Sequence, residues 1–341
     1  MPRLSLGGRD LFKLLRLSGL IVFPIILVFG IDLTKTADVL RDSQLALVLL
    51  GLALMQGAIM LRIWRWKLVA EASGVHYPRF WDYAALFYTG LFAGAAMPQL
   101  AASFAPVLFV SEAGHSWRRA VVSILFDRLV ELAVILLFAF AAAVYLYPDF
   151  PEMSLAVMVA LATLGVGALL ALAVLRYVRR WLANGGQLPW RGVASALQLL
   201  EAEETREILV KLRACVLPVA AVSAVILAIQ TAIIVVLAEA LSLNVSLPFL
   251  VMAWSLVTLA VTLPISIAGL GLREGVLVVM FTSAGEPKEE ALALGLLFFL
   301  VVLITRLPGA LTWLRGAPVA DTSSALAPAA PRGEQPVNAD G

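Results

Sequence analysis

The sequence predicts an all-α polytopic membrane protein with six full transmembrane helices and two helical hairpins that are broken by proline. Of its 341 residues, 62% are apolar and 14% are charged, a composition too apolar for a soluble core of this size. Apolar runs of about 20 residues, the length that crosses a bilayer, recur along the chain.

Six runs have the length and composition of full transmembrane helices: residues 14–33, 45–68, 120–146, 153–175, 216–240 and 290–313. The first run follows four basic residues and superficially resembles a signal peptide. No small-residue cleavage site follows it, which favours a first membrane helix whose basic end lies in the cytoplasm.

Two longer apolar regions, residues 81–112 and 247–283, are interrupted near their middles by Pro98 and Pro264 and by small residues. Proline and glycine end or kink helices, so each region is expected to form a helical hairpin. The half-segments before the two prolines are about 17 residues long, close to the shortest span that crosses a bilayer. The hairpins therefore either cross fully or are re-entrant, and the sequence leaves both open.

The two hairpin regions share one layout: an acidic loop residue, an apolar run ending in Pro, a small-residue break and a short apolar run closing on Ala-Gly. Paired interruptions of this kind are typical of transporters in which broken helices line a site near the bilayer midplane. We predict an inverted repeat of residues 45–146 and 216–313. A chance resemblance between two apolar hairpins is the alternative.

Lys and Arg residues accumulate on cytoplasmic loops. If both hairpins return to the side that they entered, the basic loop residues all fall on one side, and the opposite loops are acidic or nearly neutral. Both termini are then predicted to be cytoplasmic, and the hairpins enter from opposite faces. The basic residues are Arg3, Arg9, Lys13, Arg16, Arg62, Arg65, Lys67, Arg79, Arg118, Arg119, Arg176, Arg179, Arg180, Arg191 and Arg315.

Two further segments lie outside the predicted membrane helices. Residues 188–213 combine apolar and charged residues at mixed helical spacings, which fits an amphipathic helix on the membrane surface or a plain solvated connector. Residues 316–341 are rich in Ala, Pro and small polar residues and are predicted to be a disordered cytoplasmic tail. Residues 1–315 form a single predicted membrane domain.

Composition argues against several functional classes. A net charge of +2 gives no indication of nucleic-acid binding. The single cysteine, Cys215, excludes an intramolecular disulfide. His76 and His115 lack neighbouring ligands, so no metal site is predicted. No nucleotide-binding loop or cofactor motif is present, which leaves ion coupling or passive equilibration as driving forces.

Charged side chains at membrane depth need a partner or a wet cavity, because each costs about 2.5 to 3.5 kcal/mol on insertion scales. The six deepest are three acids and three bases, so the set can neutralise itself. A structural ionic staple between helices and a transport site are both compatible with it. The six are Asp127, Arg128, Glu131, Arg273, Glu274 and Arg306.

The second hairpin adds a reason to expect anion binding. Gly269 and Gly271 permit unusual backbone turns, and the half-helix after them begins with unpaired N–H groups beside Arg273. A phosphate would be held by these dipoles and a guanidinium. Arg128 and Arg306 would add contacts, with Glu274, Asp127 or Glu131 neutralising them when the cargo leaves. At the two breaks, Gln99 and Ser266 are expected to line the pathway.

The segment from Pro264 to Gly275, PISIAGLGLREG, resembles the flippase-like family named after the transmembrane region of bacterial lysylphosphatidylglycerol synthase. Asp127-Arg128, Trp64-Arg65-Trp66 and Leu307-Pro308-Gly309 extend the resemblance over about residues 10–315.

The resemblance implies a multi-pass protein of the bacterial cytoplasmic (inner) membrane that handles aminoacylated phospholipids, lipid-linked sugars, or polyprenyl or hopanoid precursors. The synthases carry a soluble transferase domain after the membrane part. Here about 25 residues follow the last predicted span, so we expect a stand-alone member without aminoacyl transfer.

The favoured function is lipid transport: flipping of an anionic lipid or lipid-linked precursor by alternating access around the two hairpins. The alternatives are an intramembrane lipid-modifying enzyme with Glu131, Glu274 or Asp127 as base, and an accessory subunit of a lipid or glycan synthase. The expected partner is a membrane lipid, with a homo-oligomer or a synthase as further candidates.

Overall fold

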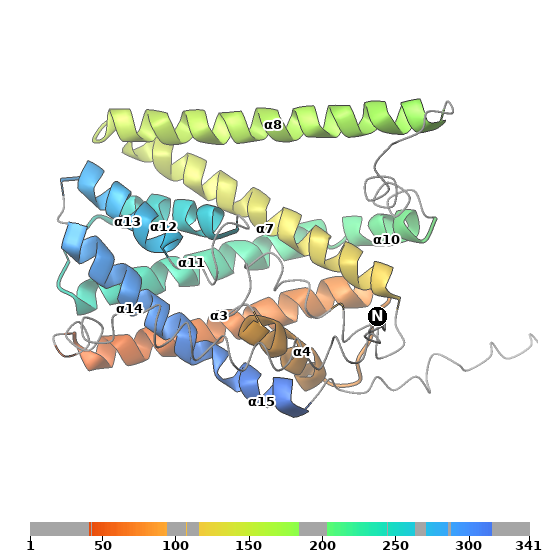
Figure 1. Cartoon of the computed structure of the whole chain (residues 1–341), viewed down its shortest axis with the longest axis horizontal. Coiled ribbons are helices and arrows are strands. Elements are labelled where there is room, and N and C mark those ends of the chain that lie inside the picture. Colours follow the sequence, from red (N-terminus) through yellow and green to blue (C-terminus); the bar gives the residue numbers. More distant parts are fainter. Residues whose placement is uncertain are drawn as a thin grey trace, which may run out of the picture.

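The computed structural model describes residues 41, 43–93, 107, 116–183, 203–243, 245–262, 271–285 and 288–315. Within these ranges the chain is helical, with turns between helices and no strands (Figure 1). The all-α prediction is therefore confirmed. The predicted first span (residues 14–33), both proline breaks and the tail lie outside the described residues.

Four helical stretches are long and apolar enough to cross a membrane. They are α3 (Leu45–Ala72), α7 (Trp117–Leu146), α11 (Val216–Ala240) and the run Glu290–Arg315, which α14 (Lys288–Arg306) and α15 (Pro308–Arg315) form together. They confirm four predicted spans, at residues 45–68, 120–146, 216–240 and 290–313. The total of six full helices stays a prediction.

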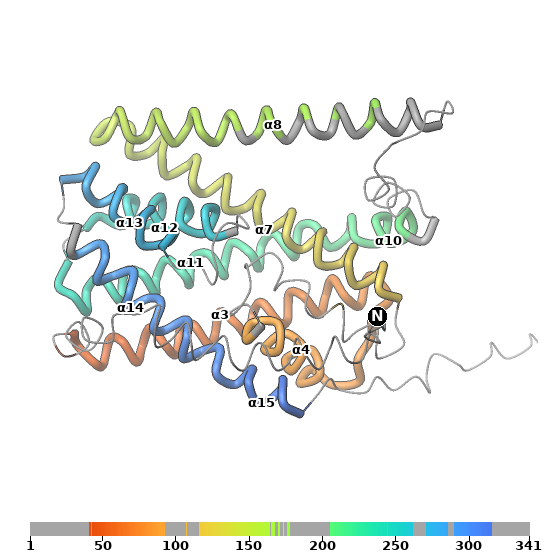
Figure 2. Tube along the Cα trace, viewed as in Figure 1, coloured from red at the N-terminus to blue at the C-terminus, as the bar shows by residue number. Residues whose placement is uncertain are grey.

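The bundle is built on an antiparallel pair, α3 and α11 (Figure 2). At one end the N–H of Gln44 donates to the carbonyl oxygen of Ala240 at 3.2 Å. At the other end Val69 packs with Val219 in a small apolar cluster. Arg79, Arg118 and the last residues of α15 lie at the Val69 end, which we call the basic end; Asp149 and Glu152 are exposed at the opposite end.

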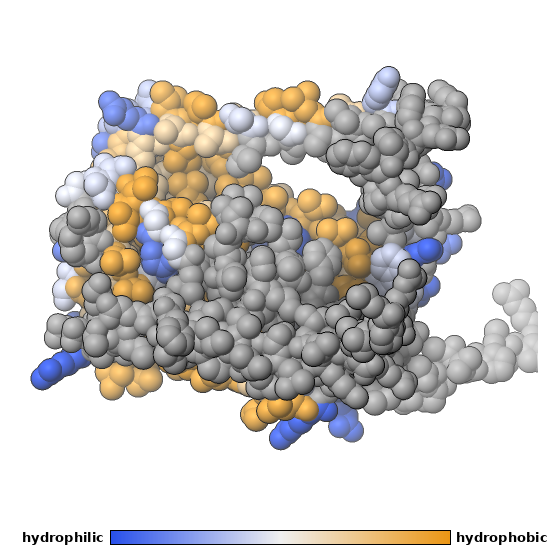
Figure 3. Space-filling model, viewed as in Figure 1, coloured by the Kyte–Doolittle hydropathy of each residue, from blue (hydrophilic) through white to orange (hydrophobic). Residues whose placement is uncertain are grey.

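The surface between these two ends is apolar, as a membrane protein requires. In the space-filling view, the described residues that are visible between the two ends are mostly apolar, and hydrophilic ones gather mostly toward the edges (Figure 3). Exposed large apolar residues continue along α7, among them Leu129, Leu137 and Phe140. Contact with lipid tails explains their exposure without any protein partner.

Three shorter helices belong to the predicted hairpin regions. α4 (Phe80–Ala93) begins near the basic end, where Tyr83 packs edge-on against Trp66 of α3. α12 (Leu247–Thr262) begins at the opposite end, and α13 (Leu272–Ser283) returns to it. At 1.5 Å per residue, these helices are about 18 to 24 Å long, less than the roughly 30 Å of hydrocarbon.

The second hairpin therefore leaves at the end where it begins. Phe249 near the start of α12 packs against Phe281 near the end of α13, with ring centroids 5.4 Å apart. Both helices are shorter than a full crossing, and whether the pair is re-entrant stays a prediction because the break between them lies outside the described residues. α4 and α12 start from opposite ends, as an inverted repeat requires, but that repeat stays a prediction because both breaks lie outside the described residues.

α8 (Pro151–Ala183) contains the predicted span at residues 153–175 and continues beyond it. It contacts α7 near the end where the two helices are joined, and the helices then diverge (Figure 1). α10 (Glu203–Arg213) falls within the predicted connector. Its Ile208 and Leu212 are buried with Val69, so its apolar face packs on the ends of α3, α7 and α11.

Gly309 sets how closely α15 approaches α4. A Cβ at this position would overlap the carbonyl oxygen of Tyr88 and would lie 2.7 Å from Cβ of Phe92. Next to this contact, the Thr89 hydroxyl bonds to the Thr312 hydroxyl at 3.0 Å. The Leu-Pro-Gly sequence thus ends α14 and brings α15 against the first hairpin.

Substituting Gly309 by Ala is expected to destabilise the folded protein by about 1 to 3 kcal/mol, since backbone atoms must move to accept the methyl group. Thermal unfolding of the purified protein measures this effect. Gly57→Ala is the matched control: nothing lies within 4 Å of its Cβ position, and alanine favours a helix interior. Equal melting temperatures for Gly309→Ala and Gly57→Ala would contradict the close packing of Gly309 against α4.

Candidate functional site

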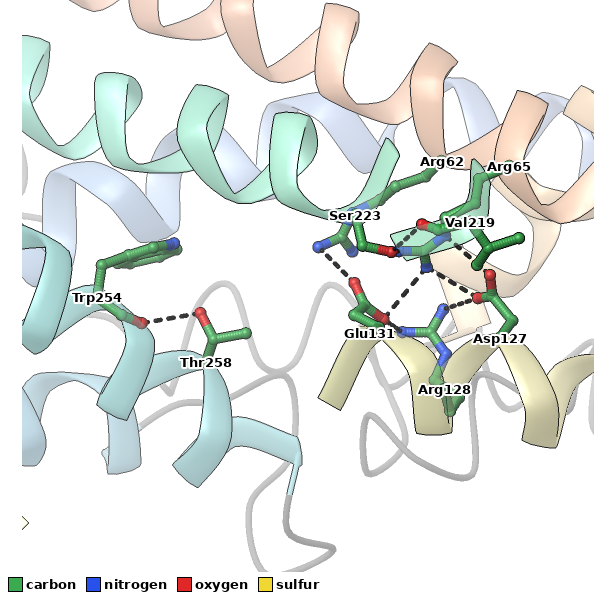
Figure 4. Close-up of polar contacts among 9 residues, drawn as sticks. All are labelled: Arg62, Arg65, Asp127, Arg128, Glu131, Val219, Ser223, Trp254 and Thr258. Atoms are coloured by element: carbon green, nitrogen blue, oxygen red, sulfur yellow. Dashed lines mark hydrogen bonds and ion pairs between the residues drawn. The ribbon is translucent and has the colours of Figure 1, made fainter. Parts of the chain in front are cut away.

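A buried ionic cluster joins α3, α7 and α11. Arg65, only 1% exposed, forms two contacts with Asp127, from Nε to Oδ1 and from Nη2 to Oδ2, each 2.8 Å (Figure 4). Its Nη1 donates to the Ser223 hydroxyl at 2.8 Å. A bidentate, fully enclosed pair of this kind is held rigidly. We call these three residues the staple.

Glu131 connects the staple to two further arginines. Its Oε2 lies 2.5 Å from Nη1 of Arg128 and 3.3 Å from Nη2 of Arg65. Its Oε1 lies 3.4 Å from Nη2 of Arg62. The three-residue spacing on α7 correctly predicts the Arg128 contact. One carboxylate is thus shared by three guanidinium groups, at 14 residues from the start of α7 and 15 from its end.

The sequence-based set of buried charges was incomplete. Arg62 and Arg65 were expected at the membrane boundary, because the second span was placed at residues 45–68, but α3 continues to Ala72. The buried charges among the described residues are Arg65, Arg273 and Arg306 against Asp127, Glu131 and Glu274. The partly exposed Arg62 and Arg128 add two further positive charges, so the whole set is not neutral. Asp127 and Glu131, four residues apart on one helix face, were the signal that cations had to face α7.

α13 supplies two more charges, and it begins where Gly271 adopts φ +75°, a conformation that favours glycine. The N–H of Gly271 donates to Oε2 of Glu274 at 2.7 Å. Glu274 thus caps its own helix and occupies one of the N–H groups that were expected to bind an anion. Its remaining oxygen, Oε1, is 3.8 Å from Nη1 of Arg273.

Arg273 is 4% exposed and lies over two aromatic rings. Its guanidinium carbon is 5.3 Å from the Phe298 ring centroid and 5.6 Å from that of Phe299. Cation–π contacts of this kind stabilise a desolvated guanidinium while leaving its in-plane N–H groups directed elsewhere.

A cavity of about 120 Å³ lies between α3, α4, α7, α11, α12, α13 and α14. Four arginines line it: Arg62, Arg128, Arg273 and Arg306. Glu131 is the one carboxylate among its described lining residues. At 1.5 Å per residue, Glu131 is about 21 to 23 Å from either end of α7, so the cavity reaches the middle of this helix.

The cavity is polarised along its length. Arg62, Arg128 and Arg306 lie toward the basic end of their helices. Seven residues earlier on α3, about 10 Å closer to the opposite end, Met55 lines the wall, together with Ile135, Gln230 and Trp254 on other helices. Three of the four lining arginines therefore lie toward the basic end, and toward the opposite end the wall is apolar with neutral polar groups. The fourth, Arg273, lies over Phe298, which packs against Trp254.

A family model described as the lysylphosphatidylglycerol synthase TM region matches residues 14–309. The chain belongs to this family. Membership in this family identifies the chain as a membrane protein whose relatives handle lipids. No curated protein and no solved structure matches the chain in the corresponding comparisons.

The structure brings together most of the residues that we singled out from the sequence in this family member. Arg128, Glu131, Arg273 and Arg306 line the cavity. Asp127 belongs to the staple, and Glu274 and Gly271 to the start of α13. Gln99, Ser266 and Gly269 lie outside the described residues. Three lining residues, Arg62, Gln230 and Trp254, were not among the site residues predicted from the sequence.

Among the described residues, no three His, Cys, Asp or Glu side chains come together as ligands for a metal ion. The donors that line the cavity are of the kind that bind anions in proteins. Four guanidinium groups provide forked donors that match phosphate oxygens, and the surrounding apolar wall strengthens the attraction by excluding water.

Proposed function

We propose that this protein flips an anionic lipid or lipid-linked precursor across the cytoplasmic membrane by alternating access. The observation that carries the proposal is the cavity that reaches the middle of α7, lined by four arginines and one carboxylate among the described residues. Such an excess of positive charge is costly in hydrocarbon unless an anion shares the site.

Glu131 would act as the resident counter-ion. It contacts Arg62, Arg65 and Arg128. A phosphate that enters would take over contacts with Arg62 and Arg128, while Arg65 would stay bound to Asp127 and Ser223. Exchange of partners keeps the charges compensated at each stage, which lowers the barrier to loading and release.

Opening to alternate leaflets would come from the two hairpin regions. α4 starts at the basic end, α12 starts at the opposite end and α13 returns to it, and each of the three contributes lining residues. Rocking of one unit against the other would open the cavity first to one face and then to the other. Family membership supports lipid as the cargo.

The decisive experiment uses vesicles that contain the pure protein and an anionic phospholipid with a fluorescent acyl chain. A flippase moves the labelled lipid to the outer leaflet, where a membrane-impermeant quencher reaches it, and leaves it chemically unchanged. An intramembrane enzyme alters the lipid, as chromatography would show. If the labelled lipid is neither moved nor altered, the protein acts as an accessory subunit and the proposal is refuted.

The proposal includes an orientation with the basic end in the cytoplasm. Cys215, the chain's single cysteine, lies partly exposed between α10 and α11 at this end. A membrane-impermeant maleimide is expected to label it in inside-out vesicles and not in intact spheroplasts. Asp149→Cys in a Cys215→Ala background is the matched control and should show the reverse pattern; labelling of Cys215 from outside would invert the assigned topology.

A further inference from the structure

The half of the cavity farthest from Arg62 contains polar groups that the proposed phosphate contacts do not use. Trp254 is 4% exposed and lines the cavity, and its indole Nε1–H has no hydrogen-bond partner in the described part of the chain. Figure 4 shows this nitrogen on the edge of the ring directed toward Arg62 and Glu131. A buried donor without an acceptor is costly, so a ligand atom that accepts from it is favoured.

Gln230 provides a second neutral group in the same half. It lies two helical turns, about 10 Å, beyond Ser223 on the same face of α11, is 8% exposed and lines the cavity. Its amide makes no hydrogen bond to another described residue. The amide offers both a donor and an acceptor, which suits a hydroxyl group.

The position of Trp254 relative to the cationic half is fixed by packing. Its ring lies 4.2 Å from that of Phe298, centroid to centroid, and Arg273 lies over the same Phe298 ring. The Phe298 ring thus lies between the Arg273 guanidinium, which would bind the lipid phosphate, and the Trp254 N–H, which would bind the headgroup attached to that phosphate.

The described residues that line this half include no carboxylate to pair with a positively charged headgroup. Glu131, the one carboxylate among the described lining residues, is already shared by three arginines. An ammonium group here would face four guanidinium groups without a free acid, and such repulsion discriminates strongly between ligands.

We propose that Trp254 and Gln230 form a neutral hydrogen-bonding subsite that selects a phosphodiester lipid with an uncharged, hydroxyl-bearing headgroup, such as a polyol. This inference rests on the proposed function, because it takes the arginine half as the phosphate site. The arginines hold the phosphodiester, the indole N–H donates to a headgroup hydroxyl oxygen, and the Gln230 amide completes the contact.

The test measures binding of three short-chain lipids to the purified protein in detergent by native mass spectrometry. Phosphatidylglycerol carries the hydroxyls, phosphatidylpropanol has the same charge without them, and phosphatidylethanolamine carries an amine. We expect the unaltered protein to prefer phosphatidylglycerol over both. Trp254→Phe, which keeps an aromatic ring and removes the N–H, should lower phosphatidylglycerol affinity about five-fold and leave phosphatidylpropanol affinity unchanged.

Trp66→Phe is the matched control, since the indole nitrogen of Trp66 is equally buried and unpartnered among the described residues but does not line the cavity. It should leave both affinities unchanged. Gln230→Leu gives an independent test of the subsite and should weaken phosphatidylglycerol selectively.

The outcomes separate the two proposals. If Trp254→Phe and Gln230→Leu bind phosphatidylglycerol as the unaltered protein does, or if phosphatidylethanolamine binds equally well, the subsite is refuted while the phosphate site stands. If phosphatidylglycerol and phosphatidylpropanol both fail to bind the unaltered protein, the subsite and the proposed function are both refuted.

Discussion

Replacing Asp127 with alanine is expected to destabilise the folded protein by about 3 to 5 kcal/mol, the cost of leaving a buried charge without its partner. Arg65 would keep its 1% exposure but lose both contacts of 2.8 Å. Its remaining contacts, to Ser223 and at 3.3 Å to Glu131, cannot replace a bidentate carboxylate. The melting temperature of the purified protein in detergent measures the loss.

Two further variants show whether the charge itself is responsible. Asp149→Ala, at an exposed position at the opposite end, should leave the melting temperature unchanged. The double variant Arg65→Met with Asp127→Leu should recover most of the loss, because well-packed apolar residues often match or exceed a buried ion pair in stability. If Asp127→Ala melts at the same temperature as the unaltered protein, the staple does not stabilise the bundle.

Replacing Arg273 with glutamine is expected to reduce lipid translocation in reconstituted vesicles at least about 30-fold, to the background rate. Losing one partner of a buried charge pair costs about 2 to 5 kcal/mol. Abundance in the membrane should stay unchanged, since Glu274 keeps its hydrogen bond to the Gly271 N–H and α13 keeps its cap. The rate of quencher access to labelled lipid is the measurement.

Arg273→Lys distinguishes charge from geometry: it keeps the positive charge but not the guanidinium fork, so an intermediate rate is expected. Arg315→Gln, exposed at the end of α15, serves as the control and should transport at the normal rate. Unchanged transport by Arg273→Gln would remove this residue from the mechanism and leave the phosphate contacts to the other arginines.

Much of the helical arrangement could be predicted from the sequence because apolar length is a direct consequence of bilayer thickness. The predicted ends of two spans, residues 146 and 240, are the last residues of α7 and α11. The turn at Gly271 and the contact between Arg128 and Glu131 also followed from local rules, the one from glycine's backbone freedom and the other from helical spacing.

The rest depended on long-range packing that local patterns do not encode. The sequence alone gave no reason to extend α3 to Ala72, and so Arg62 and Arg65 were assigned to the membrane boundary instead of to Asp127 and Glu131. Trp254 shows the same limit: most Trp residues fall near interfaces, and only the folding of α12 against α14 directs this one into a cavity.

The joint between α14 and α15 has a mechanical consequence. Arg306 is the last residue of α14, and α15 begins two residues later, held to α4 by the Thr89–Thr312 bond and by the contact of Gly309 with Tyr88. Any displacement of α4 would therefore be transmitted through α15 to Arg306, across a connection only two residues long. In the proposed transport cycle, this connection would move the Arg306 guanidinium toward or away from the lipid phosphate when α4 moves to open the cavity.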